Sequence, residues 1–239
     1  GSLAVHLVPP TSGGMGTVEL LKAAGVGLGD EVVVPAYGNV EVAEAAVAAG
    51  GLPVFADIDP VTYCIDPRAV QAVLTPRTAA VVAVHRFGQS ADMAGLGELA
   101  RREGLLLLEQ VEERGMYGDA AGRRGNAAYL HGRLRGVETP VEVRGHTYQQ
   151  FVVRVPGNGR PDRDAFARAL RAKGVDCRVP VKTPVHRMSE FRRDIVLSET
   201  ELAADQTLAL PVGSGMTRRE LHRVVSACNA LGGLLQPAF

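Results

Sequence analysis

The sequence predicts an α/β fold with a mostly parallel sheet, followed by a smaller α+β part. Between residues 16 and 108, strand-like and helix-like segments alternate as in βαβ units, and the strands are almost continuously apolar. Such strands are typical of a sheet covered by helices on both faces. After residue 127 the pattern changes to alternating strands and long amphipathic helices. We therefore expect two domains, residues 1–125 and residues 126–239.

The elements of the first part have local start and stop signals. Pro35 ends a short apolar strand, and Asp66 followed by Pro67 is a typical helix start. The expected strands are residues 29–37, 52–59, 78–85 and 105–108. The expected helices are residues 16–27, 41–51, 66–74 and 92–104. Residues 115–127 are rich in glycine and have no periodic pattern, so they are predicted to form a loop.

The second part has its own signals. Thr217 is a typical helix cap, and glycines end two of the helical segments. The expected strands are residues 147–156, 175–181 and a short one at 207–212. The expected helices are residues 162–174, one beginning at 198 that runs into the short strand, and 217–233.

Charge and composition narrow the class of protein. The 26 basic and 26 acidic residues cancel, which argues against a nucleic-acid or anionic-membrane partner. No apolar run reaches the length of a membrane span, and no leader segment is recognisable at the start. Cys64, Cys177 and Cys228 are odd in number and widely spaced, so neither a disulfide framework nor a metal site is predicted. These features favour a cytoplasmic protein.

Several polar residues follow predicted strands, where ligands of open α/β sheets bind. His85 ends one strand and Tyr37 follows Pro35; each is either a site residue or part of the ordinary cover of the sheet. The stretch LLLLEQVEERG places charged side chains directly after a strand. They form either a new acid–base site, with Glu109 and Glu113 as candidates, or a solvated turn. The glycine-rich segment 9–20 is either a phosphate site at a helix start or a flexible turn.

In order along the chain, long motifs resemble the DegT/DnrJ/EryC1/StrS aminotransferases. They include GVGLGDEVVVPAY, LTPRTAAVVAVHRFGQSADM, EGLLLLEQ, HTYQQFVVRVP and LAADQTLALPVGSGMTRRELHRVV. The resemblance implies a truncated fold-type-I aminotransferase-like fold, with a reduced large domain that is similar to a pyridoxal-phosphate-binding domain. It also implies a bacterial sugar or specialised-metabolite pathway and a site formed at a dimer interface.

The resemblance also shows where this chain departs from the family. Ser12, Gly13 and Gly14 stand where the family has a phosphate-binding Ser-Gly-Thr. Gln110 occupies the position of the aspartate that pairs with the pyridine nitrogen, and Glu113 that of a glutamine near the cofactor ring. The vestigial cofactor positions are therefore Ser12, Gly13, Gly14, Tyr37 and Gln110.

The segment that carries the Schiff-base lysine in the family has no counterpart here. The chain passes from residue 125 almost directly into the segment that resembles the start of the small domain. Only Lys22, Lys173 and Lys182 are present, and nothing in the spacing of Lys182 favours it as a substitute. Without a charged partner and a covalent base, little of the transamination mechanism is left.

Two hypotheses of function follow. In the first, the chain is a degenerate member that does not transaminate, holds a nucleotide-sugar or pathway intermediate, and pairs with itself or with an intact aminotransferase. In the second, it is an enzyme that uses His85, Glu109, Glu112 or Glu113 for acid–base chemistry without pyridoxal phosphate. A variant of the second keeps the cofactor, as a residual aminotransferase of a nucleotide-linked keto-sugar or with the cofactor bound non-covalently.

Overall fold

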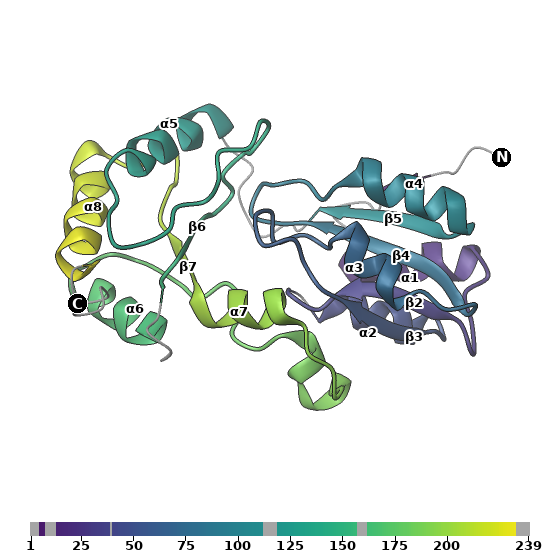
Figure 1. Cartoon of the computed structure of the whole chain (residues 1–239). Coiled ribbons are helices and arrows are strands. Elements are labelled where there is room, and N and C mark those ends of the chain that lie inside the picture. Colours follow the sequence, from purple (N-terminus) through teal and green to yellow (C-terminus); the bar gives the residue numbers. More distant parts are fainter. Residues whose placement is uncertain (1–4, 8–12, 39, 112–118, 157–161, 233–239) are drawn as a thin grey trace. The chain divides into compact units, whose positions relative to one another are not determined.

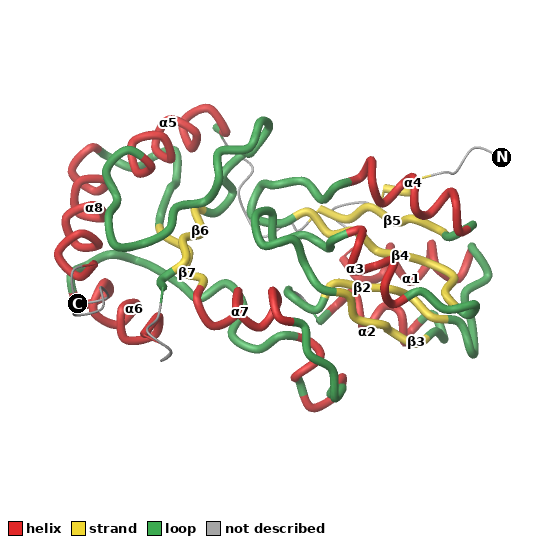
Figure 2. The backbone as a smooth tube through the Cα atoms, viewed as in Figure 1, coloured by secondary structure: helices red, strands yellow, loops and turns green. Residues whose placement is uncertain are grey.

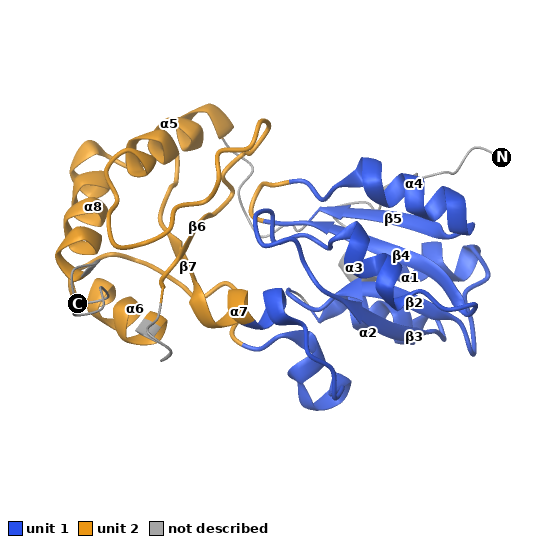
Figure 3. Cartoon of the chain, in the orientation of Figure 1, with its two compact units in different colours: residues 1–86, 90–114, 183–201 blue, residues 87–89, 115–182, 202–239 orange. Residues whose placement is uncertain are grey.

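The computed structural model describes residues 5–7, 13–38, 40–111, 119–156 and 162–232. The chain divides into two compact units, which are coloured separately in Figure 3. Unit 1 consists of residues 1–86, 90–114 and 183–201, and unit 2 of residues 87–89, 115–182 and 202–239. The later segment 183–201 thus belongs to unit 1, so the chain comes back to this unit after residue 125. The predicted division at residue 125 contains no such return.

Unit 1 is built on a parallel sheet in the order β1-β5-β4-β2-β3 (Figure 1). Its strands are β1 (Val5–Leu7), β2 (Glu31–Pro35), β3 (Leu52–Ala56), β4 (Thr78–His85) and β5 (Leu106–Val111). All four pairings are parallel, which confirms the predicted sheet. β1 was not expected from the sequence.

Helices cover both faces of this sheet. α1 (Gly13–Ala23) and α2 (Glu41–Ala48) share a core with Val34, Val82 and Leu108. α3 (Pro67–Val73) and α4 (Met93–Glu103) share the opposite core with Val81 and Leu107. The alternation of side chains along β4 and β5 explains why neighbouring residues enter different cores.

The segment 183–201 packs into unit 1. It contains the short helices η2 (Val185–Arg187) and η3 (Ser189–Phe191) and the start of α7 (Ser198–Gln206). Val185 and Phe191 are buried in the core shared with α1 and α2. The Val185 N–H donates to the Ala36 carbonyl at 2.9 Å, which fixes the segment just beyond β2.

Unit 2 has a two-stranded antiparallel sheet, β6 (Phe151–Arg154) with β7 (Thr207–Leu210). Its helices are α5 (Ala120–His131), α6 (Asp162–Ala172) and α8 (Arg218–Gly232), shown in red in Figure 2. One core includes Phe151, Leu170 and Cys228, so sheet and helices stabilise each other.

Two local predictions for unit 2 were wrong. The predicted loop at 115–127 contains the start of α5, because Arg123, Ala127 and Leu130 are buried. Burial in a tertiary core outweighs the weak helix propensity of the glycines in this helix. The predicted strand 175–181 is reduced to one bridge between Arg178 and Ala209. Within the described residues, no helix is both long and apolar enough to cross a membrane.

Candidate functional site

Three of the predicted residues, His85, Glu109 and Gln110, lie at the carboxyl ends of β4 and β5. In the register of these strands, Ala83 pairs with Glu109 and Val84 with Gln110. Because side chains alternate, Glu109 and Gln110 lie on opposite faces of the sheet, and His85 shares the face of Glu109. The two faces therefore hold two different polar arrangements.

His85 and Glu109 form a hydrogen-bonded pair on the face covered by α3 and α4. His85 Nε2 lies 2.7 Å from Glu109 Oε1, and the Ala91 N–H donates to His85 Nδ1 at 3.0 Å. The backbone donor at Nδ1 places the proton of the neutral ring on Nε2, which donates to the carboxylate. Their side chains are 12% and 28% exposed, so solvent reaches the pair. An oriented imidazole beside an accessible carboxylate is suited to acid–base chemistry.

Gln110 lies on the other face, next to α1. The Thr17 hydroxyl donates to Gln110 Oε1 at 3.1 Å, and Thr17 itself is fully buried. Gln110 therefore uses its oxygen within the fold and retains an N–H donor. Gly13 and Gly14 form the first residues of α1, about one turn before Thr17.

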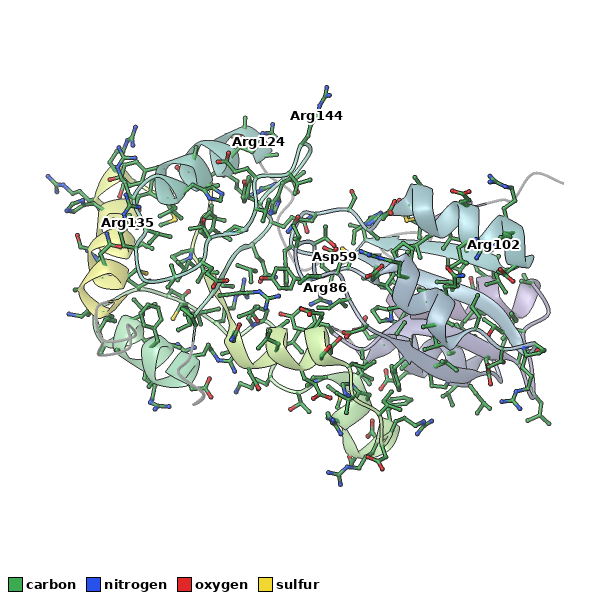
Figure 4. All side chains as sticks on the ribbon, in the orientation of Figure 1. Asp59, Arg86, Arg102, Arg124, Arg135 and Arg144 are labelled. Atoms are coloured by element: carbon green, nitrogen blue, oxygen red, sulfur yellow. The ribbon has the colours of Figure 1, made fainter. Side chains whose placement is uncertain are left out.

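Tyr37 is fully buried beyond β2 and packs inside a small cluster. Its ring stacks on Tyr63 with centroids 5.8 Å apart, and the Arg86 guanidinium carbon lies 5.2 Å from its centroid. Gly38 has a φ of +147°, a backbone conformation that L side chains rarely adopt, so this position favours glycine; a Cβ there would also displace the end of the Arg86 side chain. Arg86 follows β4 at the carboxyl edge of the sheet (Figure 4). In the present structure Tyr37 covers this edge.

Cys64 lies in the same region. Burial raises the pKa of its thiol to about 11, and the nearby Arg86 lowers it only in part. The thiol is therefore protonated at neutral pH and is a poor nucleophile.

Asp57 is a polar residue that the sequence analysis did not single out. It follows β3, and its carboxylate accepts hydrogen bonds from the Thr200 N–H at 2.8 Å and the Thr200 hydroxyl at 2.7 Å. It also accepts from the Glu199 N–H at 3.0 Å, so it binds the amino end of α7. In the sequence, the one sign of a special role for Asp57 was its position near the end of a predicted strand.

The lysines of the chain lie elsewhere. Lys22 is in the last turn of α1, and the chain then enters β2 at its amino end, opposite the edge that holds Gln110. Lys173 and Lys182 belong to unit 2 and are exposed. The predicted site positions Ser12, Glu112 and Glu113 lie outside the described residues.

A parallel sheet covered on both faces, with a helix start beside β5 and a separate α+β unit, is consistent with the fold of the fold-type-I aminotransferases. The sequence model of the DegT/DnrJ/EryC1/StrS aminotransferase family matches residues 3–113 and 117–229. The chain belongs to this family, which confirms the resemblance seen in the motifs. Members of the family use pyridoxal phosphate.

The relatives by sequence include aminotransferases and a regulatory protein. The L-glutamine:2-deoxy-scyllo-inosose aminotransferase of Streptomyces kanamyceticus is 47% identical over 108 residues, which are 45% of this chain and 25% of that protein. The L-glutamine:scyllo-inosose aminotransferase of Streptomyces griseus is 41% identical over 125 residues, 52% of this chain and 28% of that protein. A pleiotropic regulatory protein of Geobacillus stearothermophilus is 44% identical over 113 residues, 47% of this chain and 27% of that protein. This chain thus spans about a quarter of each.

Solved structures match more of the fold. DesV of S. venezuelae, in complex with a ketimine intermediate, has a TM-score of 0.80 at 24% identity and covers 92% of this chain and 83% of its own. Ntda of Bacillus subtilis with bound PMP has a TM-score of 0.81 at 20% identity and covers 95% of this chain and 72% of its own. At these identities the likeness concerns the fold.

Proposed function

We propose that this chain does not transaminate by itself and acts as a ligand-binding or accessory subunit in a bacterial sugar or specialised-metabolite pathway. The observation that carries the proposal is Gln110, which stands where the family has the aspartate and which bonds to Thr17 through its oxygen. The position of Lys22 away from this edge is in agreement. A relative that carries a regulatory name adds support for an accessory role.

The residues present do not fit pyridoxal phosphate as a covalent electron sink. When bound in that role, the cofactor needs a protonated ring nitrogen, which a carboxylate stabilises. The amide of Gln110 is neutral, and its N–H donors, which have no partner among the described residues, suit an unprotonated nitrogen. We therefore derive no catalytic step through the cofactor; if this chain holds it, we expect non-covalent binding.

The ligand and partner belong to the same proposal. We expect a nucleotide-sugar or another pathway intermediate as ligand, because one similar structure was solved in the presence of its TDP-sugar product. We expect the chain to form a homodimer or to pair with an intact aminotransferase. Co-purification with such an enzyme, followed by a change in that enzyme's rate, tests the accessory role.

The absence of transamination is tested with the purified chain. Pyridoxal phosphate is added, visible absorbance is recorded before and after borohydride, and amino transfer from L-glutamine to scyllo-inosose is assayed. We expect no absorbance that borohydride shifts and no turnover, with the S. griseus enzyme as positive control. We expect Gln110→Asp to gain no turnover, because a carboxylate alone does not replace the lysine. Sustained turnover by the unmodified chain alone would overturn the proposal.

A second candidate function is acid–base catalysis without pyridoxal phosphate. The specific observation in its favour is the 2.7 Å contact of His85 with the accessible Glu109. Under this proposal, Glu109→Gln abolishes conversion of a pathway intermediate while the protein stays folded. Glu98→Gln, on the exposed side of α4, is the matched control. Equal conversion by wild type and Glu109→Gln excludes this function.

A further inference from the structure

Unit 2 contains a pocket of about 570 Å³ that lies wholly within that unit. We call it the outer-face pocket. Its polar side chains come from two places, the residues just before β6 and the edge segment that bridges to β7. The wall includes Gln149, Gln150, Asp176, Arg178, Pro211 and Met216. The volume is in the usual range for small-molecule sites.

The geometry of the small sheet explains why polar groups gather there. Arg178 and Ala209 exchange backbone hydrogen bonds of 3.1 and 2.8 Å, so the segment with Arg178 lies beside β7 at a single antiparallel bridge. Cys177 is buried in the core of unit 2, and side chains alternate along extended backbone. Asp176 and Arg178 therefore both point to the side of the sheet away from that core.

The same alternation places Gln150 on this side. Phe151 pairs with Leu210, and both are buried in the core. Gln150 precedes Phe151 and Pro211 follows Leu210. Because side chains alternate, both residues face the outer side together with Arg178. The pocket is thus one continuous surface made by three neighbouring segments of chain.

The polar side chains of this pocket have no hydrogen-bond or ion-pair partner among the described residues. In the part of the chain that the structure describes, the carboxylate of Asp176 and the guanidinium of Arg178 make no hydrogen bond or ion pair. The same is true of the side-chain amides of Gln149 and Gln150, which are half-buried. Asp176 and Arg178 are exposed, where water solvates charged groups. Half-buried polar groups in native proteins are usually satisfied, so the two open amides beside two charged side chains in a single pocket point to a ligand.

We propose that the outer-face pocket binds a free α-amino acid as its zwitterion. Arg178 receives the carboxylate, Asp176 receives the ammonium, and the two glutamine amides receive a polar side chain. Asp176 and Arg178 lie two residues apart on extended chain, about 7 Å, within reach of both charges of one small molecule. A nucleotide or sugar phosphate would bring its negative charge against Asp176, and a neutral polyol would form no ion pair with either charged group.

The test is isothermal titration of the purified chain with L-glutamine as probe. We expect saturable binding that Arg178→Gln and Asp176→Asn each weaken by about tenfold or more, because each removes one charge-assisted contact. Arg168→Gln on α6 and Asp205→Asn on α7 remove the same charges from exposed positions outside the pocket and should leave the affinity unchanged. Circular dichroism of each variant verifies that it is folded.

Ligand analogues make the test sharper. The analogues of L-glutamine that lack the carboxyl or the amino group should each bind at least about tenfold more weakly. Failure to bind L-glutamine, equal binding by the analogues, or equal binding by the Arg178 and Asp176 variants would each overturn the proposal. So would binding of scyllo-inositol in place of L-glutamine. The inference does not rest on the proposed function: Gln110→Asp in unit 1 should leave this binding unchanged, whatever its effect on turnover.

Discussion

The two units use polar side chains in different ways. At the sheet edge of unit 1, Asp57, His85, Glu109 and Gln110 each have a hydrogen-bond partner inside the unit. In the outer-face pocket of unit 2, the four polar side chains named above have none among the described residues. At the edge that carries chemistry in the family, these four side chains thus have internal partners here, whereas the four side chains of the outer-face pocket have none among the described residues.

This difference suggests how to tell polar side chains that stabilise the fold from those that bind a ligand. A polar group with internal partners stabilises the fold, and its removal leaves those partners unpaired. A polar group without partners contributes little to stability, so its removal should affect only a ligand. Removing a charge or a polar group should therefore lower the free energy of unfolding in unit 1 and the affinity for a ligand in unit 2.

The largest effect is expected at Asp57. Asp57→Ala leaves the N–H and hydroxyl of Thr200 unpaired, and Thr200 is fully buried. We expect a loss of about 3 kcal/mol in the free energy of unfolding, measured by urea denaturation. Asp205→Ala, which removes an exposed carboxylate, is the control and should change stability by less than about 0.5 kcal/mol. Equal midpoints for the two variants would contradict the comparison.

The next effect concerns pH and His146, a buried group of unit 2 that does have internal partners. Its Nδ1 accepts the Tyr148 N–H at 3.0 Å, and its ring stacks on Tyr148 with centroids 3.8 Å apart. Burial lowers the pKa of His146 from 6.5 to about 4, a hydrogen bond with the Gly88 backbone partly opposes this, and the charge of His131 adds to the lowering.

Between pH 6.5 and pH 4, the unfolded chain therefore binds a proton at His146 that the folded chain does not. The contribution to stability is complete above pH 6.5 and is lost as the pH falls towards 4. We expect a loss of about 2 kcal/mol over this range, after allowance for screening by water. His146→Asn should flatten the profile, and His222→Asn on the exposed side of α8 should not. A smaller slope remains from His131, whose pKa burial also lowers.

A smaller loss is expected at the pair on β4 and β5. Glu109→Gln keeps an oxygen acceptor for His85 Nε2 and removes the charge, so we expect a loss of about 1 kcal/mol by urea denaturation. Glu98→Gln is again the control. A stability equal to that of the wild type would show that the contact contributes nothing to the fold and would strengthen an acid–base role.

The smallest effect is expected in the outer-face pocket. Asp176→Asn and Arg178→Gln should each change the free energy of unfolding by less than about 0.5 kcal/mol, although they weaken amino-acid binding. Thermal melting without and with L-glutamine measures both quantities, since a ligand that binds the folded state raises its stability. A large loss of stability without ligand would mean that these groups have structural partners after all.

The sequence predicted unit 1 more completely than unit 2. Apolar strands and capped helices such as the one that begins after Asp66 depend on contacts between near neighbours, and these were identified correctly. The first part of helix α5 was predicted as a loop because its glycines disfavour a helix, and its buried face against the core of unit 2 stabilises it. The edge segment with Arg178 was predicted as a full strand, but it makes one bridge to β7.

The candidate site divides in the same way. The family, the positions of His85, Glu109 and Gln110 at strand ends, and the lack of a lysine in the expected segment were all available from residue order alone. The contact of His85 with Glu109, which are 24 residues apart, required the register of two strands. The bond of Thr17 to Gln110 required the packing of a helix on the sheet.

The residue types and their order along the chain determined the α/β fold of unit 1 and the family, because these depend on local patterns and motifs. Only the tertiary structure decided that Asp57 binds the start of α7 and that Asp176 and Arg178 share a pocket with Gln149 and Gln150. The physical reason is that such contacts join segments far apart in the chain. Their partners follow from strand pairing and from which face of each element is buried, and residue order by itself does not specify either.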